Sequence, residues 1–459
     1  MSIMKKAALL SAAFCVMLSG CSMNMSVDTL LSPPKLSDEQ TEIYTALTEA
    51  AGNVDLRYPR MGEYLSAFVI NDLDADGSPE AMVFFERRSS DVNVPAEREA
   101  GLRIGFLDRD ENGDWRSVYE MAASGTEVES VEFSTLGSDS PKAIITYAGL
   151  SSQEKRLSII GYSDGAPYEA HQMTVSQFCL SAVSEDNGEL LLTLTRATQT
   201  MPPFFTVYGF NSDGSFTPLY APIALSNNIA DFDRFTTGYY SLNGTPMFCA
   251  AIDYLQAENQ YSTELVYFNG NGFVTANSFL FSGNQTSYIR RTNSYTPKLN
   301  SRDINGDGIL DVPMTSVLPG YESLTFPEQL NAVWWFSQES GNIERVATMF
   351  VDPQMNYTFT FPGRWEGVVT VTWDAEENTV TFWRAEEDGS HEFALLTIKT
   401  IATENINDYD ENAAAKDSFK LFAANEDITV YVKNIEYQGL SLTYDEVAAA
   451  LYVISDKEP

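Results

Sequence analysis

The sequence is poor in basic residues, histidine and cysteine, and each shortage excludes a class of function. Its 459 residues include 28 Lys and Arg against 64 Asp and Glu, for a net charge of −36. Nucleic acids are bound through an excess of Lys and Arg, so they are excluded as partners. Two His and four Cys leave little material for histidine catalysis or a Cys/His zinc site. Hydrophobic residues, at 44%, are nevertheless abundant enough for sizeable cores.

The N-terminus has the organisation of an export signal. Lys5 and Lys6 precede an apolar run over 7–17 that is too short to span a bilayer. The following Leu18-Ser19-Gly20-Cys21 resembles the lipobox of bacterial lipoproteins. The resemblance implies that residues 1–20 are removed as a signal peptide and that the sulfur of Cys21 receives a diacylglyceryl group. We therefore expect an extracytoplasmic protein whose membrane partner is reached through the lipid anchor.

Residues 21–63 are predicted to form a polar tether and one N-terminal helix. Ser37 is a favourable N-cap, and Gln40 stands at the capping-box position of a helix that would run to about residue 51. Four apolar residues at helical spacing would form its buried stripe: Ile43, Ala46, Leu47 and Ala50.

From about residue 64 the chain repeats two elements, each made of a strand, a turn and a second strand. The first element occurs at 66–86, 130–147, 179–194, 236–254 and 297–314. The second occurs at 104–121, 159–173, 206–220, 265–279 and 333–350. Both series recur about every 57 residues, so each repeat holds two hairpins and four strands.

Tandem four-stranded antiparallel units are typical of β-propeller blades. We predict a mainly β fold, with a propeller of about five blades over 64–351 and a small α+β domain over 352–459. A stack of β-sandwich repeats is the alternative architecture. In the C-terminal domain we expect strands near 369–373, 380–382, 393–401, 419–424 and 428–434. A final helix should begin at Thr443, with Glu446 completing its capping box and its apolar face continuing through Leu451 and Tyr452.

Two turns of the first element place oxygen-bearing groups at the spacing of a calcium loop. The candidate ligands of the first loop are Asp72, Asp74, Asp76, Ser78 and Glu80, and those of the second are Asp303, Asn305, Asp307, Ile309 and Asp311. Ser78 and Ile309 would contribute their carbonyl oxygens, and the glycine at the sixth position permits the sharp turn. Ca²⁺ takes six to eight oxygen ligands, so we expect a structural calcium ion in each loop. Acidic turns without metal are the alternative.

These loops are not EF-hands, because position 12 is Val83 or Met314 rather than Glu and strands flank both of them. The stretch 68–80, with its F-x-x-x-DLDADG-x-x-E pattern, resembles the FG-GAP/VCBS repeats of integrin-like propellers. The chain also resembles uncharacterised surface lipoproteins of anaerobic Firmicutes, through LLSPPKLSDEQ and LRYPRMGEYLSAF. This second resemblance implies no activity. The turn over 108–113 matches only the first half of the calcium pattern and is predicted to be an acidic turn.

Three classes of function stay open. The first is a non-catalytic surface protein that binds or scaffolds an unknown protein or glycan partner. The second is a glycoside hydrolase with carboxylates in a central channel, although Asp231, Asp233 and Asp253 are too weakly marked to be named as a catalytic site. The third is a purely structural envelope component. Ser163 completes a G-x-S-x-G string, but we expect it on a hairpin turn and assign no nucleophile.

Cys179 and Cys249 are the two cysteines left after export and lipidation. Their spacing leaves open whether they pair or stay free, because sequence separation does not determine disulfide geometry.

Overall fold

The computed structural model describes most of the chain beyond the predicted tether. The described residues are 36–88, 101–149, 151, 153–163, 165–184, 188–256, 261–276, 299–325, 329–339, 342–352, 354, 356–386, 391–403 and 418–453. The predicted signal peptide and lipidation site Cys21 lie outside these residues.

The described part of the chain is mainly β, as predicted, with its strands in five sheets. The first sheet contains β1 (Val54–Leu56), β2 (Phe68–Asn71), β3 (Glu80–Arg87), β4 (Arg103–Arg109) and β5 (Trp115–Ala122). The second contains β6 (Val128–Ser134), β7 (Lys142–Ala148), β8 (Lys155–Ser163) and β9 (Ala166–Val175). The third contains β10 (Gln177–Ala182), β11 (Glu189–Thr195), β12 (Phe204–Phe210), β13 (Phe216–Pro218) and β14 (Ile223–Ala224).

The fourth sheet has nine strands and joins two halves. One half contains β15 (Ile229–Leu242), β16 (Thr245–Gln256), β17 (Tyr261–Phe268) and β18 (Phe273–Thr275). The other contains β19 (Val312–Val317), β20 (Asn331–Glu339), β21 (Asn342–Val351), β22 (Tyr357–Thr360) and β28 (Leu451–Val453). The halves meet through a parallel pairing of Ser241 with Glu339. The fifth sheet contains β23 (Val369–Asp374), β24 (Thr379–Ala385), β25 (His391–Ala402), β26 (Lys420–Ala424) and β27 (Ile428–Asn434).

The predicted alternation of two hairpins is confirmed through the first four repeats. The first-element hairpins are β2–β3, β6–β7, β10–β11 and β15–β16, all antiparallel. The second-element hairpins are β4–β5, β8–β9, β12–β13 and β17–β18. The fifth repeat differs, because an isolated bridge between Arg302 and Asp311 precedes β19 where a first strand was expected. The number of blades stays a prediction.

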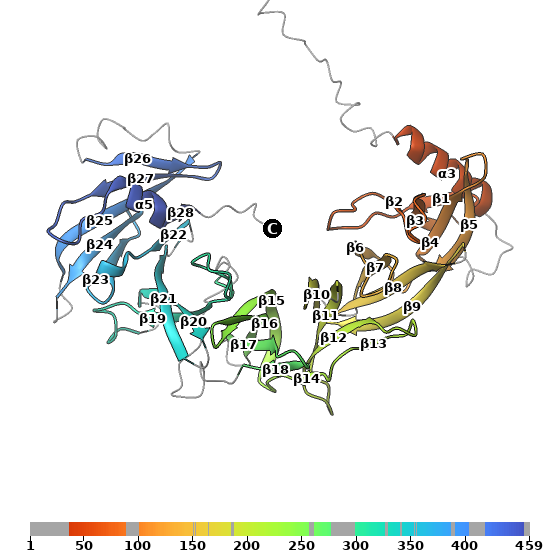
Figure 1. The fold of residues 1–459 in the computed structure, drawn as a ribbon. Coiled ribbons are helices and arrows are strands. Elements are labelled where there is room, and N and C mark those ends of the chain that lie inside the picture. The colour runs from red at the N-terminus through yellow and green to blue at the C-terminus, as the bar shows by residue number, and fades with distance from the viewer. Residues whose placement is uncertain are drawn as a thin grey trace, which may run out of the picture.

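Consecutive sheets follow one another along an open arc, with the first and fifth sheets at its two ends (Figure 1). Hydrophobic clusters fill the spaces between neighbours. One cluster joins the first sheet to the second, another the second to the third, and a third the third to the β15–β18 half. The largest cluster contains residues of β20, β21 and β22 together with the strands of the fifth sheet. The hairpin turns and sheet junctions where candidate sites lie are therefore held by face-to-face packing.

The N-terminal helix α3 (Asp38–Ala51) covers the outer face of the first sheet (Figure 1). Its predicted capping box between Ser37 and Gln40 is confirmed, with both hydrogen bonds at 3.1 Å. The predicted stripe was wrong at its end, since Ala51 is buried and Ala50 is exposed. Residues 43, 47 and 51 are spaced four apart and therefore share the face of the helix that packs on the sheet. Ala50 lies on another face and is exposed.

The C-terminal helix α5 (Tyr444–Ala450) begins as predicted, with the capping box of Thr443 and Glu446 in place. The continuation of its apolar face through Leu451 and Tyr452 was wrong. These residues belong to β28, which pairs with β22. The unpaired edge of β22 supplies backbone hydrogen bonds there, and this tertiary pairing overrides the helical pattern of the sequence. A short 3₁₀ helix, η4 (Gly363–Trp365), follows β22.

The packing between the first two sheets can be tested at Phe84, whose ring is fully buried in their shared cluster. We expect Phe84→Ala to lower the free energy of unfolding by about 3–5 kcal/mol, because it removes a buried ring and leaves a cavity. Urea unfolding measures this loss. Tyr119→Ala, on β5 of the same sheet with 48% of the residue exposed, is the control and should change stability by no more than about 0.5 kcal/mol. Equal losses in both variants would contradict this placement of the core.

Candidate calcium loops

The first acidic loop connects β2 to β3 and is organised by hydrogen bonds from its own backbone to its carboxylates. Asp72 accepts from the N–H groups of Asp76 and Gly77 at 3.2 and 3.0 Å. Asp74 accepts from Asp76 N–H at 3.2 Å, and Asp76 accepts from Ser78 N–H at 2.7 Å. The side chains at positions 1, 3 and 5 are thus fixed relative to the turn.

The second acidic loop repeats this pattern position by position. Asp303 accepts from the N–H groups of Asp307 and Gly308 at 3.2 and 2.8 Å. Asn305 Oδ1 accepts from Asp307 N–H at 3.1 Å, and Asp307 accepts from Ile309 N–H at 2.8 Å. The same residue spacing has therefore produced the same local fold in two distant parts of the chain.

A left-handed residue precedes the central acid in each loop. Ala75 has φ of 65°, and Gly306 at the equivalent position has φ of 79°. A left-handed backbone costs an L-residue roughly 1–2 kcal/mol, whereas glycine adopts it freely. The first loop keeps this geometry despite the alanine, so its hydrogen bonds and its attachment to the sheet outweigh the strain.

The ninth position of each loop is a buried acid. Glu80 is 2% exposed and Asp311 is 0% exposed. Glu80 Oε2 accepts from Leu73 N–H at 2.7 Å, and Asp311 Oδ2 accepts from Ile304 N–H at 3.0 Å. Burial raises the pKa of Glu80 to about 7 and the pKa of Asp311 to about 6, and neighbouring carboxylates add to both shifts. Ionising either group therefore costs more than it does in water, and a cation close to the carboxylate would offset that cost.

Two further observations fit a cation at these positions. In the first loop, Asp72, Asp74 and Glu80 each bring a carboxylate oxygen within 4.8 Å of the others. In the second, Asp311 Oδ1 is buried and makes no hydrogen bond of good geometry within the described residues, although the Ser337 hydroxyl is near enough to lower the pKa of this carboxyl. A buried oxygen without a donor can be satisfied by a metal ion. The structure thus brings together three of the five predicted ligands of the first loop.

Asp108 is an acid near the first loop that the sequence pattern missed. It lies on β4, which pairs with β3 beside the loop. Burial raises the pKa of Asp74 and Glu80, and the charge of Asp108 adds to both shifts. Only the strand register brings it there, so no short motif would have revealed it. The neighbouring turn is closed by Asp110, which accepts from the N–H groups of Asn112 and Asp114 at 2.8 and 3.1 Å. This geometry fits the acidic turn expected at 108–113.

The second loop joins two units of the fold. Ile309 forms a parallel bridge with Tyr239 of β15, and Leu310 N–H donates to the Tyr239 carbonyl at 2.8 Å. Arg302 and Asp311 exchange backbone hydrogen bonds at 3.1 and 2.9 Å. Whatever fixes this loop therefore also fixes the passage from the β15–β18 half to the strands that follow.

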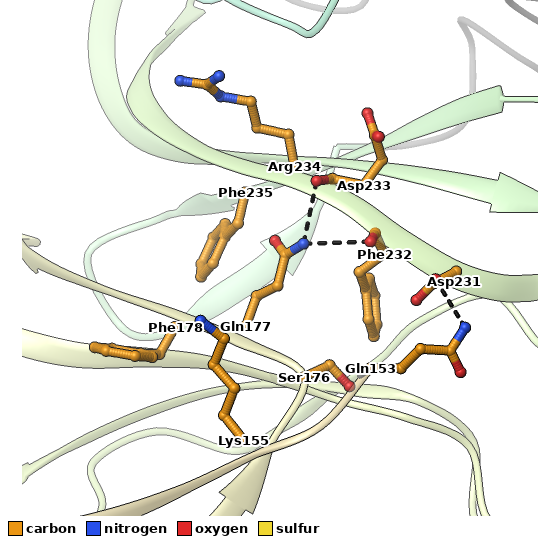
Figure 2. Close-up of a pocket in the computed structure, with 10 residues that line it drawn as sticks. All are labelled: Gln153, Lys155, Ser176, Gln177, Phe178, Asp231, Phe232, Asp233, Arg234 and Phe235. Atoms are coloured by element: carbon orange, nitrogen blue, oxygen red, sulfur yellow. Dashed lines mark hydrogen bonds between the residues drawn. The ribbon is translucent and has the colours of Figure 1, made fainter. Parts of the chain in front are cut away.

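Of the three aspartates considered for a channel, the structure buries one in the core and places the other two in a groove. Asp253 is 2% exposed and accepts from the backbone N–H and the hydroxyl of Ser301, each at 2.8 Å, and from the Thr263 hydroxyl. It therefore holds strands together in the core. Asp231 and Asp233 instead line a groove on β15, drawn in Figure 2.

Ser163 ends β8 and pairs with Ala166, so the G-x-S-x-G string lies on a β-hairpin, as expected. Cys179 and Cys249 are both free thiols, which answers the question left open by their spacing. Burial raises the pKa of the Cys179 thiol to about 12. Such a thiol is neutral at physiological pH and unreactive as a nucleophile.

Comparison with known proteins adds little to this picture. No family model and no curated protein sequence matches the chain. Among solved structures, a protein from Lactobacillus plantarum is 8% identical and has a TM-score of 0.26, covering 73% of this chain and 85% of its own. The exotype rhamnogalacturonan lyase YesX is 10% identical and has a TM-score of 0.27, covering 74% and 84%. Similarities this distant support no inference about function. Among the described residues, no helix is long and apolar enough to cross a membrane.

The buried acid of the first loop makes stability depend on pH when calcium is removed. Folded Glu80 keeps its proton up to a pKa of about 7, whereas its ordinary value is 4.5. Between these values the folded state binds more protons than the unfolded state, so the free energy of unfolding falls as pH rises. In chelator, Glu80→Gln should make this fall shallower than in the unmodified chain, as measured by urea unfolding from pH 4.5 to 7.5. Glu111→Gln, at an exposed turn position, should leave the slope unchanged, and equal slopes in all three proteins would contradict the prediction.

Proposed function

We propose that the chain is an extracytoplasmic lipoprotein, anchored through Cys21, that binds or scaffolds a partner and is stabilised by two structural calcium ions. Its repeated hairpins would form a β-propeller of about five blades. The observation that carries the calcium assignment is the shared geometry of the two acidic loops, each ending in a buried acid. Each acid accepts one backbone hydrogen bond from its loop, which only partly offsets the cost of burying a carboxylate, and a bound cation would offset the rest.

The donor set favours Ca²⁺ over Mg²⁺. Every candidate ligand offers oxygen, and the loops mix carboxylates with the amide of Asn305 and the carbonyls of Ser78 and Ile309. Ca²⁺ accepts such mixed oxygen sets in a flexible geometry at 2.3–2.6 Å, whereas Mg²⁺ demands a near-ideal octahedron. Burial raises the pKa of Glu80 and Asp311, and repulsion from neighbouring carboxylates adds to the shift; a divalent cation would stabilise the ionised form of both groups.

A structural role fits the positions of the loops. The first ties β2 to β3 in the sheet beneath α3, and the second ties β15 to the strands of the next unit. The channel carboxylates considered for hydrolysis have other partners. Asp231 forms an ion pair with Arg196 at 3.0 Å, and Asp233 accepts from Asn300 Nδ2 at 2.5 Å. We therefore propose binding or scaffolding rather than hydrolysis.

The lipid anchor agrees with the charge of the chain. A net charge of −36 repels an anionic membrane surface, so a folded body of this composition would be retained by its lipid and not by surface electrostatics. A diacylglyceryl group is sufficient for that, because two acyl chains anchor stably where one is marginal.

Calcium should stabilise the chain through both loops. At a calcium concentration a hundredfold above Kd, each site contributes about 2.7 kcal/mol. Asp76→Ala or Asp307→Ala should remove most of one such contribution in calcium. In chelator only the smaller loss of the turn hydrogen bond from Ser78 or Ile309 N–H should remain, as measured by thermal or urea unfolding. Equilibrium dialysis should find about two ions per mature chain.

The matched control is Asp110→Ala, which removes a turn-closing carboxylate from the incomplete acidic turn. Its loss of stability should be the same in calcium and in chelator. If the loop variants behave like this control, or if dialysis finds no bound calcium, the acidic loops are turn formers only.

The anchor can be tested at Cys21. Cys21→Ser should move the protein from the membrane fraction to the soluble fraction of the host, because the sulfur is the proposed site of lipid attachment. Fractionation followed by immunoblotting measures the distribution. Cys15→Ser, within the predicted signal peptide, should leave the protein membrane-bound. Retention of Cys21→Ser in the membrane fraction would contradict the lipoprotein assignment.

A further inference from the structure

A groove of about 460 Å³ lies where β8, β10 and β15 meet. Gln177 on β10 crosses toward β15, and its Nε2 donates to the carbonyl oxygens of Phe232 and Asp233 at 3.3 and 3.2 Å (Figure 2). The groove thus forms between strands of three different repeats. We propose that it binds a short segment of neutral oligosaccharide.

Irregularity of β15 creates one wall of the groove. The register between β15 and β16 shifts between Ile229 and Asp231 and again between Phe232 and Arg234. Such bulges redirect side chains and often lie beside binding sites. Figure 2 shows the result. The rings of Phe232 and Phe235 point from β15 toward Gln177 of β10, whereas Arg234 points away from it. The shifts therefore place two rings toward the groove from nearby positions on one strand.

The lining combines ring faces with uncharged hydrogen-bonding groups. Phe178 and Phe235 are partly exposed and line the groove together with Gln153 and Gln177. A sugar ring presents C–H groups on its faces and hydroxyl groups around its rim. Aromatic side chains cover the C–H faces. The Nε2 of Gln153 donates to Asp231 Oδ2 at 2.8 Å and that of Gln177 to the two β15 carbonyls, so it is the Oε1 atoms of both amides that would accept from sugar hydroxyl groups.

Ser176 supplies an unsatisfied polar group in the wall of the groove. The residue is 7% exposed, and its Oγ has no hydrogen-bond partner among the described residues. Buried polar groups are nearly always paired, and an unpaired one needs an explanation. A ligand hydroxyl would provide the missing partner, because Ser Oγ can both donate and accept.

The charges in the groove favour a neutral ligand over an anionic or cationic one. Lys155 lies 3.1 Å from Glu129, and Asp231 lies 3.0 Å from Arg196. These two of the four charged lining residues are therefore balanced by the protein itself. Of the other two, Asp233 accepts from Asn300 Nδ2, and Arg234 points away from the groove (Figure 2). The net charge of −36 also opposes the approach of phosphates or uronic acids.

This inference names a ligand class for the binding protein proposed above. It rests on that proposal in one respect, because a protein must lie outside the cytoplasm to meet extracellular glycans. The groove residues are distinct from the candidate calcium ligands. Failure of either idea can therefore be recognised separately.

The experiment uses the full mature chain carrying Cys21→Ser, in calcium, on an array of neutral oligosaccharides of glucose, galactose, mannose and N-acetylglucosamine. Oligosaccharides that contain uronic acid form the acidic comparison set, and hits are measured by titration calorimetry. We expect binding to at least one neutral oligosaccharide. Phe178→Ala and Phe235→Ala should weaken it about tenfold.

Ser176→Ala keeps the test independent of folding defects. Removing a hydroxyl that has no protein partner should leave the thermal midpoint unchanged or raised, yet weaken sugar binding about two- to tenfold. Trp373→Ala, which removes an aromatic side chain from a residue that is 38% exposed on β23 outside the groove, should leave affinity unchanged.

The proposal is overturned if no neutral oligosaccharide binds at millimolar concentration, if only the acidic set binds, or if Ser176→Ala retains full affinity. Calcium stabilisation without sugar binding would overturn the groove assignment alone. Sugar binding without calcium stabilisation would overturn the loop assignment and leave the groove in place.

Discussion

The structure depends on covering both faces of its sheets. The strand β3 is representative: Val83 and Phe85 face the cluster beneath α3, while Met82 and Phe84 face the cluster shared with the second sheet. A strand buried on both sides requires a neighbour on each, so a repeat cannot bury its apolar surface alone. The N-terminal helix meets this requirement at one end of the arc, where no preceding sheet packs within the described residues. Stability is thereby shared along the chain.

This requirement explains which parts of the fold could be predicted from the sequence. Doubly buried strands appear as continuous apolar runs such as AMVFF and LLL, and the turns between these runs predict the hairpins. The capping boxes of α3 and α5 are equally local, so they were also predictable. The errors arose where a distant segment decided the outcome. Leu451 continues a helical pattern but pairs with β22, and no local signal reports that edge.

The candidate sites divide in the same way. Each acidic loop gathers its candidate ligands within nine residues, so its spacing alone was enough to propose a cation site there. Asp108 approaches the first loop only through strand register, and the pattern of that loop could not include it. The groove was beyond sequence reasoning altogether. It combines residues from Gln153 to Phe235, and the bulges of β15 that shape it have no sequence signature comparable to an Asp-x-Asp-x-Asp-Gly turn.

The buried acids also bear on how tightly the proposed ions would be held. Glu80, with a pKa of about 7, is partly protonated near neutral pH, so a bound ion must displace that proton. This competition weakens the apparent affinity of the first loop, and the extracellular calcium modules that it would resemble bind in the range of about 10⁻⁴–10⁻³ M. Sites of that strength would be filled only where calcium is plentiful. For a protein proposed to act outside the cytoplasm, the loops would then become rigid after export, and the unfavourable burial of Glu80 and Asp311 would become favourable at the same time.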